Sequence, residues 1–515
     1  MGNAVKGADL LVRSAVASGV EVCFSNPGTT ELPLVAALDS VPGMRAYLGL
    51  FEGVCTGAAD GYGRMLGKPA MTLLHLGPGL ANGISNLHNA RRAGTPVFNV
   101  IGEHVTWHRP ADPPLAMDIE SMAAAVSGWR RTSTSAESLG RDAAEAVAAS
   151  LKGQIATLIV PQDHQWSECE DDGISPMPEY PMQTREFPLE DAVRVLRSGK
   201  KTALIIGGRG LQREGLVQAA RIRAVAGCDL LAECFPAHME RGAGLPDLQR
   251  IPYFPEMAIT MLAAYQCVIL AGAQKPVAFF GYKGMESPLL RDDQRCIYLG
   301  DGRDMQKGLK DLADALGAPA SPDRSILARL KRPGLPEGPL SGAIICTLLA
   351  ALQPEGAIIV DESITSGAHY YPQSGGAPQF SLLTLTGGSL GLGPSCAVGA
   401  AVACPDRPVI NLEADGSCMY TVQALWTQAR EGLNVTTLIC ANRSYNILKV
   451  ELARAGVSYK GGNTANLLDL SGIDWVSIGQ GLGVPSTRVR TAQELAVELQ
   501  KALAEDGPHL IEMFL

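Results

Sequence analysis

The chain has 515 residues and a formal net charge of −9, so it lacks the positive surface expected of a non-specific nucleic-acid binder. Hydrophobic residues make up 46% of the sequence and charged residues 18%, which is typical of a globular enzyme with large buried cores. No apolar run reaches the roughly 18 residues of a membrane-spanning helix, and the amino terminus has no signal-peptide layout. We therefore expect a cytoplasmic protein of about three domains, with no membrane partner.

The first 165 residues alternate between helix-like and strand-like segments, beginning with helical spacing over residues 5–18. The segments EVCFSNPG, PAMTLLHLGPG and TPVFNVIGEH each pass from an apolar run to a glycine or proline turn, and QIATLIVPQD ends the series. This alternation predicts a parallel α/β domain over residues 1–165, with its ligands at the carboxyl ends of the strands.

Two proline-rich stretches divide the rest of the chain. Residues 166–187 are acidic and predict a linker, and residues 319–340 predict a second one. Between them, residues 188–318 carry strand signals in TALIIGGRG, CDLLAEC, CVILAG and CIYLGDG. The GGRG turn resembles half of a dinucleotide fingerprint, but it lacks the full pattern and a convincing acidic ribose partner, so we interpret it as a structural turn.

The third α/β domain, residues 341–515, contains the stretch EADGSCMYTVQALWTQAREGLNVTTLICANRSYNIL. Asp415 follows an apolar strand, and Asn442 follows the next strand along the chain. Because a strand–helix–strand unit places the ends of two parallel strands side by side, we expect these side chains to converge. Oxygen ligands beside a glycine turn at a helix start suit Mg²⁺ holding a phosphate group. Taken alone, however, this pair is also compatible with an ordinary loop and turn.

Glu52 forms a second candidate site, in YLGLFEGVCTGAADGYGR. It is an acid at the end of an apolar strand, at the start of a helix rich in small residues. On its own it is either a helix N-terminal charge stabilised by the helix dipole or a catalytic carboxylate.

Taken together, these motifs resemble those of thiamine-diphosphate-dependent 2-oxo-acid decarboxylases and carboligases. The matches, in chain order, are Glu52 with GAADGYGR, HLGPGLANGISNLHNA, GGSLGLGPSCAVGAA and ADGS…NRSY. The family's usual GDG has become Ala414-Asp415-Gly416 and its usual NN has become Ala441-Asn442. Both residues that carry the ligand chemistry are retained.

The resemblance implies three doubly wound parallel-sheet domains: a pyrimidine-binding, a middle and a diphosphate-binding domain. It also implies thiamine diphosphate and Mg²⁺ as cofactors. The Mg²⁺ ligands would be Asp415, Asn442 and the Ser444 carbonyl. Gly416, Ser417 and Thr365 would bind the phosphate oxygens, and Tyr445 would belong to the same cofactor-binding set.

For the other end of the cofactor, the resemblance places the Glu52 carboxylate against the pyrimidine ring, where it would activate the cofactor. Leu390 would be the apolar wedge beneath the bent cofactor, and the Gly388 backbone would accept a hydrogen bond from its amino group. In the family, the two ends of the cofactor bind to different subunits. This implies a homodimer at minimum and favours a homotetramer.

Two members of the family are candidates for the activity. His75 and Thr29, each near a strand end, resemble the acid–base and substrate-binding groups of benzoylformate decarboxylase. The alternative for His75 is a strand-end residue bonded to backbone, but the flanking motif favours the active-site role. The family's second histidine is missing from AFFGYKG, where Phe280 and Tyr282 stand instead. His104 or His108 could replace it, or both could lie in a surface loop.

The alternative is an acetolactate-synthase-type carboligase acting on pyruvate. Against it, LAMDIESMAAAV stands in place of that group's phenylalanine–glutamine–glutamate stretch. The middle domain also lacks a flavin-contact pattern, which argues against FAD. The sequence does not identify the side chain of the 2-oxo acid, which depends on the packing of Met117, Phe280, Ile447, Leu448 and Glu451.

Overall fold

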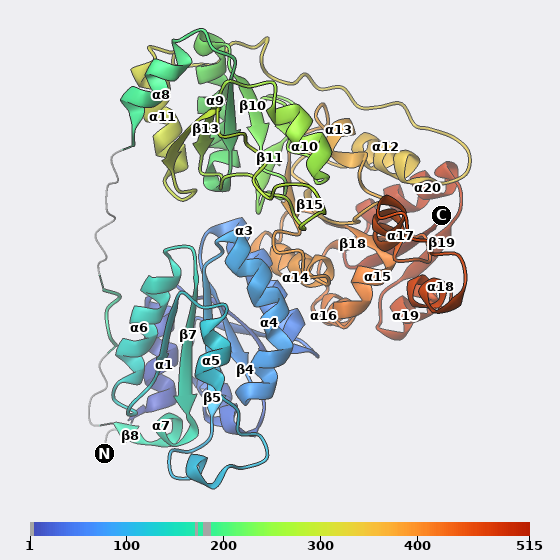
Figure 1. Ribbon diagram of the computed structural model, residues 1–515. Helices are drawn as coiled ribbons and strands as arrows, with labels where there is room; N and C mark the ends of the chain where they lie inside the picture. Colours follow the sequence, from blue (N-terminus) through green and yellow to red (C-terminus); the bar gives the residue numbers. More distant parts are fainter. Residues whose placement is uncertain (1–4, 170–173, 179–186) are drawn as a thin grey trace.

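The structure is a computed structural model that describes residues 5–169, 174–178 and 187–515. It has three lobes in chain order, drawn from blue through green to red, and the C-terminus lies in the third (Figure 1). Residues 170–173 and 179–186 of the predicted first linker lie outside the described residues. Residues 319–340 cross from the middle lobe to the third lobe, with single bridges at Leu327 and Pro339.

The N-terminal lobe, within residues 5–169, is built on a six-stranded parallel sheet. Its strands in spatial order are β3 (Arg45–Leu48), β2 (Val22–Asn26), β4 (Ala70–Leu74), β5 (Val97–Glu103), β7 (Ile155–Pro161) and β6 (Trp129–Thr132). One face packs against α1 (Gly7–Ala17), α2 (Leu32–Ser40) and α6 (Leu139–Ser150). The other packs against α3 (Glu52–Leu66), α4 (Leu76–Ala93) and α5 (Ile119–Ala124).

The middle lobe has a five-stranded parallel sheet among residues 187–318. Its strands in spatial order are β12 (Gln249–Arg250), β10 (Asp229–Ala232), β9 (Thr202–Ile206), β13 (Cys267–Ala271) and β14 (Arg295–Gly300). The helices α8 (Leu189–Leu196), α9 (Arg213–Ala226) and α11 (Met305–Ala315) cover one face, and α10 (Pro255–Leu262) covers the other.

The C-terminal lobe is built on a seven-stranded sheet among the described residues. Its strands in spatial order are β11 (Met239–Arg241), β16 (Phe380–Thr384), β15 (Ile358–Glu362), β17 (Val409–Ala414), β18 (Val435–Ala441), β20 (His509–Phe514) and β19 (Ser486–Val489). The helices that matter for the site are α14 (Gly393–Ala403), α15 (Asp415–Cys418), α16 (Ala424–Glu431) and α17 (Asn446–Arg454). One edge strand of this sheet, β11, comes from the middle segment of the chain and pairs antiparallel with β16.

These elements confirm the predicted α/β class with parallel sheets. β4, β5, β9 and β13 are buried along their whole length, as expected for parallel strands with helices on both faces. The edge strand β11 was not predicted, since three residues give no readable alternation. No helix among the described residues is long and apolar enough to cross a membrane.

Helices α3 and α14 bring the first and third lobes into contact (Figure 1). A Cβ atom at Gly57 would lie 2.0 Å from the Ser395 hydroxyl, and one at Gly61 would lie 2.1 Å from the Cys396 carbonyl oxygen. The small residues of GAADGYG are therefore required for close helix packing. The same helix carries a buried ion pair of 2.6 Å between Arg64 and Asp60, and Arg64 also donates to the Thr384 carbonyl at 2.7 Å.

Candidate active site

Asp415 and Asn442 meet at the carboxyl edge of the C-terminal sheet. Strands β17 and β18 pair in parallel, with Ala414 opposite Cys440, so the residues that follow them are neighbours. The Asp415 carboxylate is 2% exposed and accepts the backbone N–H groups of Gly416 (2.9 Å) and Arg443 (2.5 Å). Burial raises the pKa of Asp415 to about 6, and the hydrogen bonds from the two backbone N–H groups oppose that rise.

The donor set at this edge fits a hard cation. The Asn442 Oδ1 atom accepts the Ser444 N–H at 3.0 Å, and the buried Ser444 hydroxyl has no hydrogen-bond partner among the described residues. No group of three or more His, Cys, Asp or Glu residues in the described part of the chain could hold a metal. A Mg²⁺ ion here would rest on one carboxylate, one amide oxygen and one carbonyl, and would need phosphate oxygens or water to complete its shell.

The other predicted phosphate-binding residues surround this point. Tyr445 packs on Gly416, where a Cβ atom would lie 2.5 Å from the ring. The Thr365 hydroxyl accepts a hydrogen bond from Asn446 at 3.2 Å. The Ser417 hydroxyl, which was expected to bind phosphate, donates instead to the Glu413 carboxyl at 2.6 Å.

The predicted cofactor segment spans residues 387–401, and its first part, residues 387–391, forms the turn before α14. Gly388 (φ +72°) and Gly391 (φ +92°) have left-handed backbone conformations that favour glycine. The Asn89 side chain of α4 donates to the Ser389 carbonyl (2.8 Å) and accepts the Ser389 N–H (3.2 Å). The first lobe therefore fixes this turn. The Phe279 ring lies directly over Gly388, where a Cβ atom would come within 2.4 Å of it.

At the N-terminal sheet, Glu52 begins α3 and is only 8% exposed. Its carboxylate accepts a hydrogen bond from Asn82 of α4 at 3.0 Å. One residue on, the Gly53 carbonyl accepts from Asn86 at 2.8 Å, and the same amide nitrogen lies 3.3 Å from the Gly391 carbonyl. The start of α3 and the turn after Leu390 are therefore tied together within one chain.

His75 follows β4 and is the residue just before α4, and its ring contacts side chains. Its Nδ1 atom lies 2.8 Å from the Glu31 carboxylate and 3.2 Å from the Thr30 hydroxyl. Glu31 is fully buried and also accepts the Gly28 N–H at 2.9 Å. Thr29 is exposed, and its carbonyl accepts from Gln162, so Thr30 and not Thr29 meets His75.

Sequence reasoning missed Glu31. The available signal was an acid within NPGTTELP, one short turn after a strand end. Glu31 lies in the 3₁₀ turn Thr29–Glu31, which aims its carboxylate at the neighbouring strand end. This turn also decides which of the two adjacent threonines faces the histidine.

Glu52 and His75 lie on either side of Gly79. A Cβ atom at Gly79 would lie 3.3 Å from Glu52 Oε1 and 3.5 Å from the His75 Cβ. The structure thus brings two of the residues that the sequence predicts as catalytic close to one glycine, whereas Thr29 is exposed.

Backbone strain gathers at the same places. Among the described residues, the non-glycine positions with positive φ are Leu76, Asp112, Ile364 and Arg443. Leu76 follows His75, Ile364 precedes Thr365, and Arg443 lies between Asn442 and Ser444. Strained backbone of this kind is typical of positions whose geometry serves a function.

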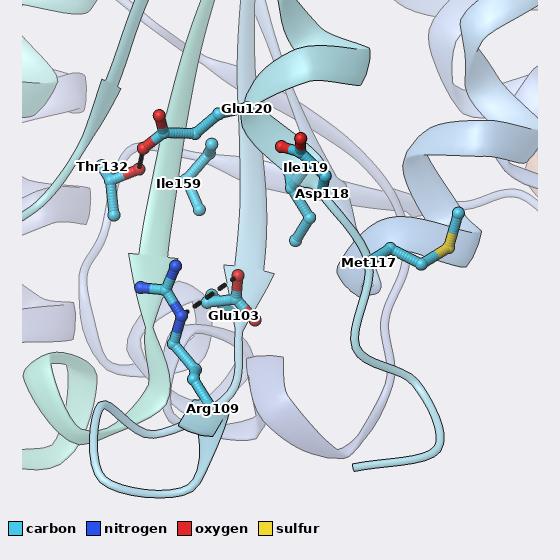
Figure 2. A pocket seen from close by; sticks show the side chains of 8 residues that line it. All are labelled: Glu103, Arg109, Met117, Asp118, Ile119, Glu120, Thr132 and Ile159. Atoms are coloured by element: carbon cyan, nitrogen blue, oxygen red, sulfur yellow. Dashed lines mark hydrogen bonds and ion pairs between the residues drawn. The ribbon is translucent and has the colours of Figure 1, made fainter. Parts of the chain in front are cut away.

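A pocket of about 230 Å³ lies at the carboxyl ends of β5 and β7 (Figure 2). Arg109 faces Glu103 in it at 3.8 Å, and Glu120 bonds to Thr132 (Figure 2). Met117 lines the pocket and also packs on Gly77, two residues from His75. His104 and His108, in the loop after β5, have their rings 5.7 Å apart.

The middle lobe contributes aromatic rings rather than a histidine. Phe279 and Phe280 stack edge to face at 4.9 Å, and Phe280 is 55% exposed. The Tyr282 hydroxyl donates to Glu451 of α17 at 3.2 Å. Because α17 follows the Asn442–Ser444 turn, this contact joins the aromatic segment to the phosphate side of the site.

In the glycine turn of the middle sheet, the two central backbone N–H groups are already hydrogen-bonded. The Gly208 N–H donates to the Glu233 carboxylate at 3.2 Å, and the Arg209 N–H donates to the Gly302 carbonyl at 2.9 Å. Glu233 follows β10, the strand beside β9, so an acid does stand where the sequence analysis found no partner. Burial raises its pKa to about 7.

Comparisons with known proteins agree with this geometry. Residues 5–122 match the thiamine pyrophosphate enzyme N-terminal TPP binding domain, and residues 364–513 match the corresponding C-terminal TPP binding domain. The chain belongs to the thiamine pyrophosphate enzymes.

Among its relatives, the chain is 48% identical to the Mycobacterium tuberculosis protein named "Putative acetolactate synthase large subunit IlvX", with 99% of each chain covered. It is 27% identical to the benzoylformate decarboxylase of Pseudomonas aeruginosa, with 96% of each covered. The fold is similar to the structure of Rhodococcus jostii RHA1 thiamine diphosphate-dependent 4-hydroxybenzoylformate decarboxylase, with a TM-score of 0.84, 24% identity and 99% of each chain covered. The chain is therefore a thiamine-diphosphate-dependent enzyme of the decarboxylase and acetolactate synthase group.

Proposed function

We propose that this protein catalyses the Mg²⁺-dependent, non-oxidative decarboxylation of a 2-oxo acid, in the manner of benzoylformate decarboxylase. The observation that carries the proposal is the pair of Glu52 and His75 across Gly79, with His75 bonded to the buried Glu31. A carboxylate and a histidine close to the same glycine can divide the tasks of cofactor activation and proton transfer.

The phosphate end of the cofactor would be held at the C-terminal sheet. Asp415, Asn442 and the Ser444 carbonyl would bind Mg²⁺, and Gly416, Thr365 and Tyr445 would surround the diphosphate. The Ser417 hydroxyl is directed to Glu413, so we assign it a supporting role beneath the phosphate. When bound, thiamine diphosphate supplies the carbon nucleophile and the electron sink for loss of CO₂.

The Glu52 carboxylate would bind the pyrimidine ring and hold the proton that activates it. Asn82 fixes the direction of this carboxylate, which is largely shielded from solvent. Leu390 would support the bend of the cofactor, and the Gly388 carbonyl would accept from its amino group.

His75 would bind the substrate carboxylate and move a proton to or from the reacting carbon. Because a carboxylate accepts hydrogen bonds, the tautomer that suits this contact donates Nδ1–H to Glu31, and in that tautomer Nε2 is left to act on the substrate. Because the described middle-lobe segment 275–285 presents aromatic rings and no histidine, we assign the proton transfer to His75 alone.

The second candidate is acetolactate-synthase-type carboligation of pyruvate. It is favoured by the printed name of the 48% identical Mycobacterium relative. Both candidates share the steps up to loss of CO₂. The decarboxylase then releases an aldehyde, whereas the carboligase joins the remaining fragment to a second pyruvate and releases acetolactate. FAD has no part in this proposal, since Glu233 takes the glycine-turn amide that a dinucleotide phosphate would need.

We also propose a homodimer or homotetramer with the active site at a subunit interface. Leu50, Met419 and Tyr420 are 40–53% exposed and flank Glu52 and the Leu390 turn, and such apolar side chains suit a partner surface. Light scattering during gel filtration tests this proposal, and a monomer in the active fraction would contradict it.

The function is tested with the purified full-length chain, thiamine diphosphate and Mg²⁺, against pyruvate, branched 2-oxo acids and benzoylformate. CO₂ and organic product are measured together. We expect aldehyde from a bulky acid, and we expect Glu52→Gln to bind the cofactor but to lose turnover by roughly 10²-fold or more. Glu21→Gln, an exposed acid of the same lobe, serves as the control.

The outcomes separate the two candidates. Acetolactate from pyruvate would replace the decarboxylase proposal by the carboligase one. Full activity of Glu52→Gln would contradict the role of this carboxylate in either reaction.

A further inference from the structure

Glu362, which no motif singled out, lies directly beneath the turn that carries Leu390. It is the last residue of β15 and is 2% exposed. Its Oε1 atom accepts the Gly391 N–H at 2.8 Å and its Oε2 atom accepts the Gly393 N–H at 2.5 Å. Both oxygens are thus committed to the backbone of one turn, and such charge-assisted hydrogen bonds are stronger than neutral ones.

A second carboxyl stands beside it on the neighbouring strand. Glu413 of β17 pairs in register with Glu362 and is fully buried. A Cβ atom at Gly393 would lie 1.9 Å from Glu413 Oε2 and 3.1 Å from Glu362 Oε2. The two acids therefore enclose Gly393, and in the described part of the chain neither forms an ion pair with a lysine or arginine.

These carboxyls connect the two ends of the proposed cofactor site. On the phosphate side, Glu413 Oε1 accepts the Ser417 hydroxyl at 2.6 Å. On the pyrimidine side, Glu362 accepts the N–H of Gly391, the residue after Leu390. Gly388 lies three residues before Gly391 in the same turn. The Gly391 carbonyl is held in turn by Thr421 at 2.8 Å. Both the amide and the carbonyl of Gly391 are therefore fixed.

We propose that Glu362 is a positioning residue that sets the Leu390 wedge and the Gly388 carbonyl at the position needed to activate the cofactor, and that Glu413 connects this turn to the phosphate side. The inference rests on the proposed function, because the roles of Leu390 and Gly388 belong to it. Glu362 touches neither the substrate nor the reacting atoms, and acts through the backbone.

The rival explanation is that Glu362 only stabilises the fold. A buried carboxylate with two backbone donors does stabilise its turn, so loss of stability cannot separate the two explanations. The proton-exchange rate at the reactive carbon of the bound cofactor can separate them, because it depends on the position of the cofactor amino group and is measured per bound cofactor, without substrate.

The experiment compares wild-type protein, Glu362→Ala and Glu362→Gln, all full length and loaded with thiamine diphosphate and Mg²⁺. Cofactor affinity is measured by calorimetry, and hydrogen–deuterium exchange at the reactive carbon is measured by quenched NMR. We expect Glu362→Ala to slow exchange by roughly 10- to 100-fold, since small misplacements of reacting groups have effects of this size. Cofactor affinity should change by less than about threefold, because the metal ligands are untouched.

Glu362→Gln keeps the shape and one good acceptor oxygen, so exchange should recover to a value between those of the alanine variant and the wild type. It also carries the test if the alanine variant fails to fold. The control is Glu240→Gln, which neutralises a half-buried glutamate of the same sheet, bonded to Ser381 in β16 and to His238 and away from the site. Its exchange rate should equal that of the wild type.

Exchange at the wild-type rate in both Glu362 variants would overturn this inference while leaving the proposed function intact. Absence of cofactor binding or exchange in the wild type would overturn the proposed function, and this inference with it.

Discussion

The middle and C-terminal sheets both present a glycine turn after a buried parallel strand, yet only the C-terminal edge places an acid beside an amide oxygen. In the C-terminal sheet, Asp415 and Asn442 lie side by side, and the buried Ser444 hydroxyl lacks a partner among the described residues. In the middle sheet, Glu233 occupies the Gly208 amide, and a Cβ atom at Gly208 would lie 2.6 Å from Gly302. The middle turn is closed by its own chain.

The difference shows that a glycine turn alone does not make a phosphate site. What matters is where the nearby acid points. Each turn has an acid that accepts a glycine N–H, namely Asp415 at Gly416 and Glu233 at Gly208. Only Asp415 also stands beside an amide oxygen, that of Asn442, and so offers a second oxygen ligand for the metal that binds the phosphate. The following predictions test this contrast.

Asp415→Ala should have the largest effect. Removing a residue that only supports a metal ligand typically weakens metal binding by roughly 10- to 100-fold. Loss of the ligand Asp415 itself should weaken Mg²⁺-dependent cofactor binding by more than this, and turnover should be lost with it. Calorimetric titration of thiamine diphosphate with and without Mg²⁺ measures the effect. Glu233→Ala is the matched control, and its cofactor affinity should stay at the wild-type value. If both variants bound the cofactor equally well, the contrast between the two edges would be wrong.

His75→Ala tests the N-terminal edge, where the acid Glu31 is bonded to a histidine as well as to the Gly28 N–H of its own turn. We expect turnover to fall by roughly 10²–10⁴-fold, as for loss of an acid–base group, with cofactor affinity unchanged. Glu31→Gln should retain part of the activity and alter the pH profile, because it weakens the bond that orients the ring. His164→Ala, whose ring bonds to Ser133, is the control. A less than threefold loss for His75→Ala would make this residue structural.

Much of this arrangement could be predicted from the sequence, because strand ends are read from apolar runs followed by glycine turns. Asp415, Asn442, Glu52 and His75 all lie at such ends. The metal pair in particular depends only on one strand–helix–strand unit, whose geometry is nearly fixed.

The parts that escaped prediction depend on long-range contacts or on local turns without a sequence signature. Glu31 reaches His75 across 44 residues, and Glu362 reaches Gly391 across 29 residues. The choice of Thr30 over Thr29 depends on a single 3₁₀ turn. In each case the residue type was visible in the sequence, but the direction of the side chain was not.

Glu233→Gln should change stability in a pH-dependent way. The folded-state pKa of about 7 lies above the roughly 4.3 of an unfolded glutamate, so the folded protein binds more protons between these values and loses stability as pH rises through this range. Glutamine removes the titration and keeps an acceptor for the Gly208 N–H. The variant should therefore gain roughly 1–2 kcal/mol more relative to wild type at pH 8 than at pH 5. Thermal unfolding at the two pH values measures this difference, and an equal gain at both would show that Glu233 is ionised in the folded protein throughout this range.

Phe280→Ala should have the smallest effect and shows how the middle lobe serves the site despite its closed glycine turn. The lobe contributes the Phe279–Phe280 pair, with Phe279 lying over Gly388. If Phe280 lines the pocket for the substrate side chain, its removal should lower kcat/KM for benzoylformate by about 10-fold and leave that for pyruvate nearly unchanged, since a contact with an apolar group discriminates by this order. Tyr298→Ala, a comparably exposed ring on β14, should alter neither value. An equal loss for both substrates would instead assign Phe280 to the support of the cofactor turn, so that the middle lobe would act on the shape of the site and not on its choice of substrate.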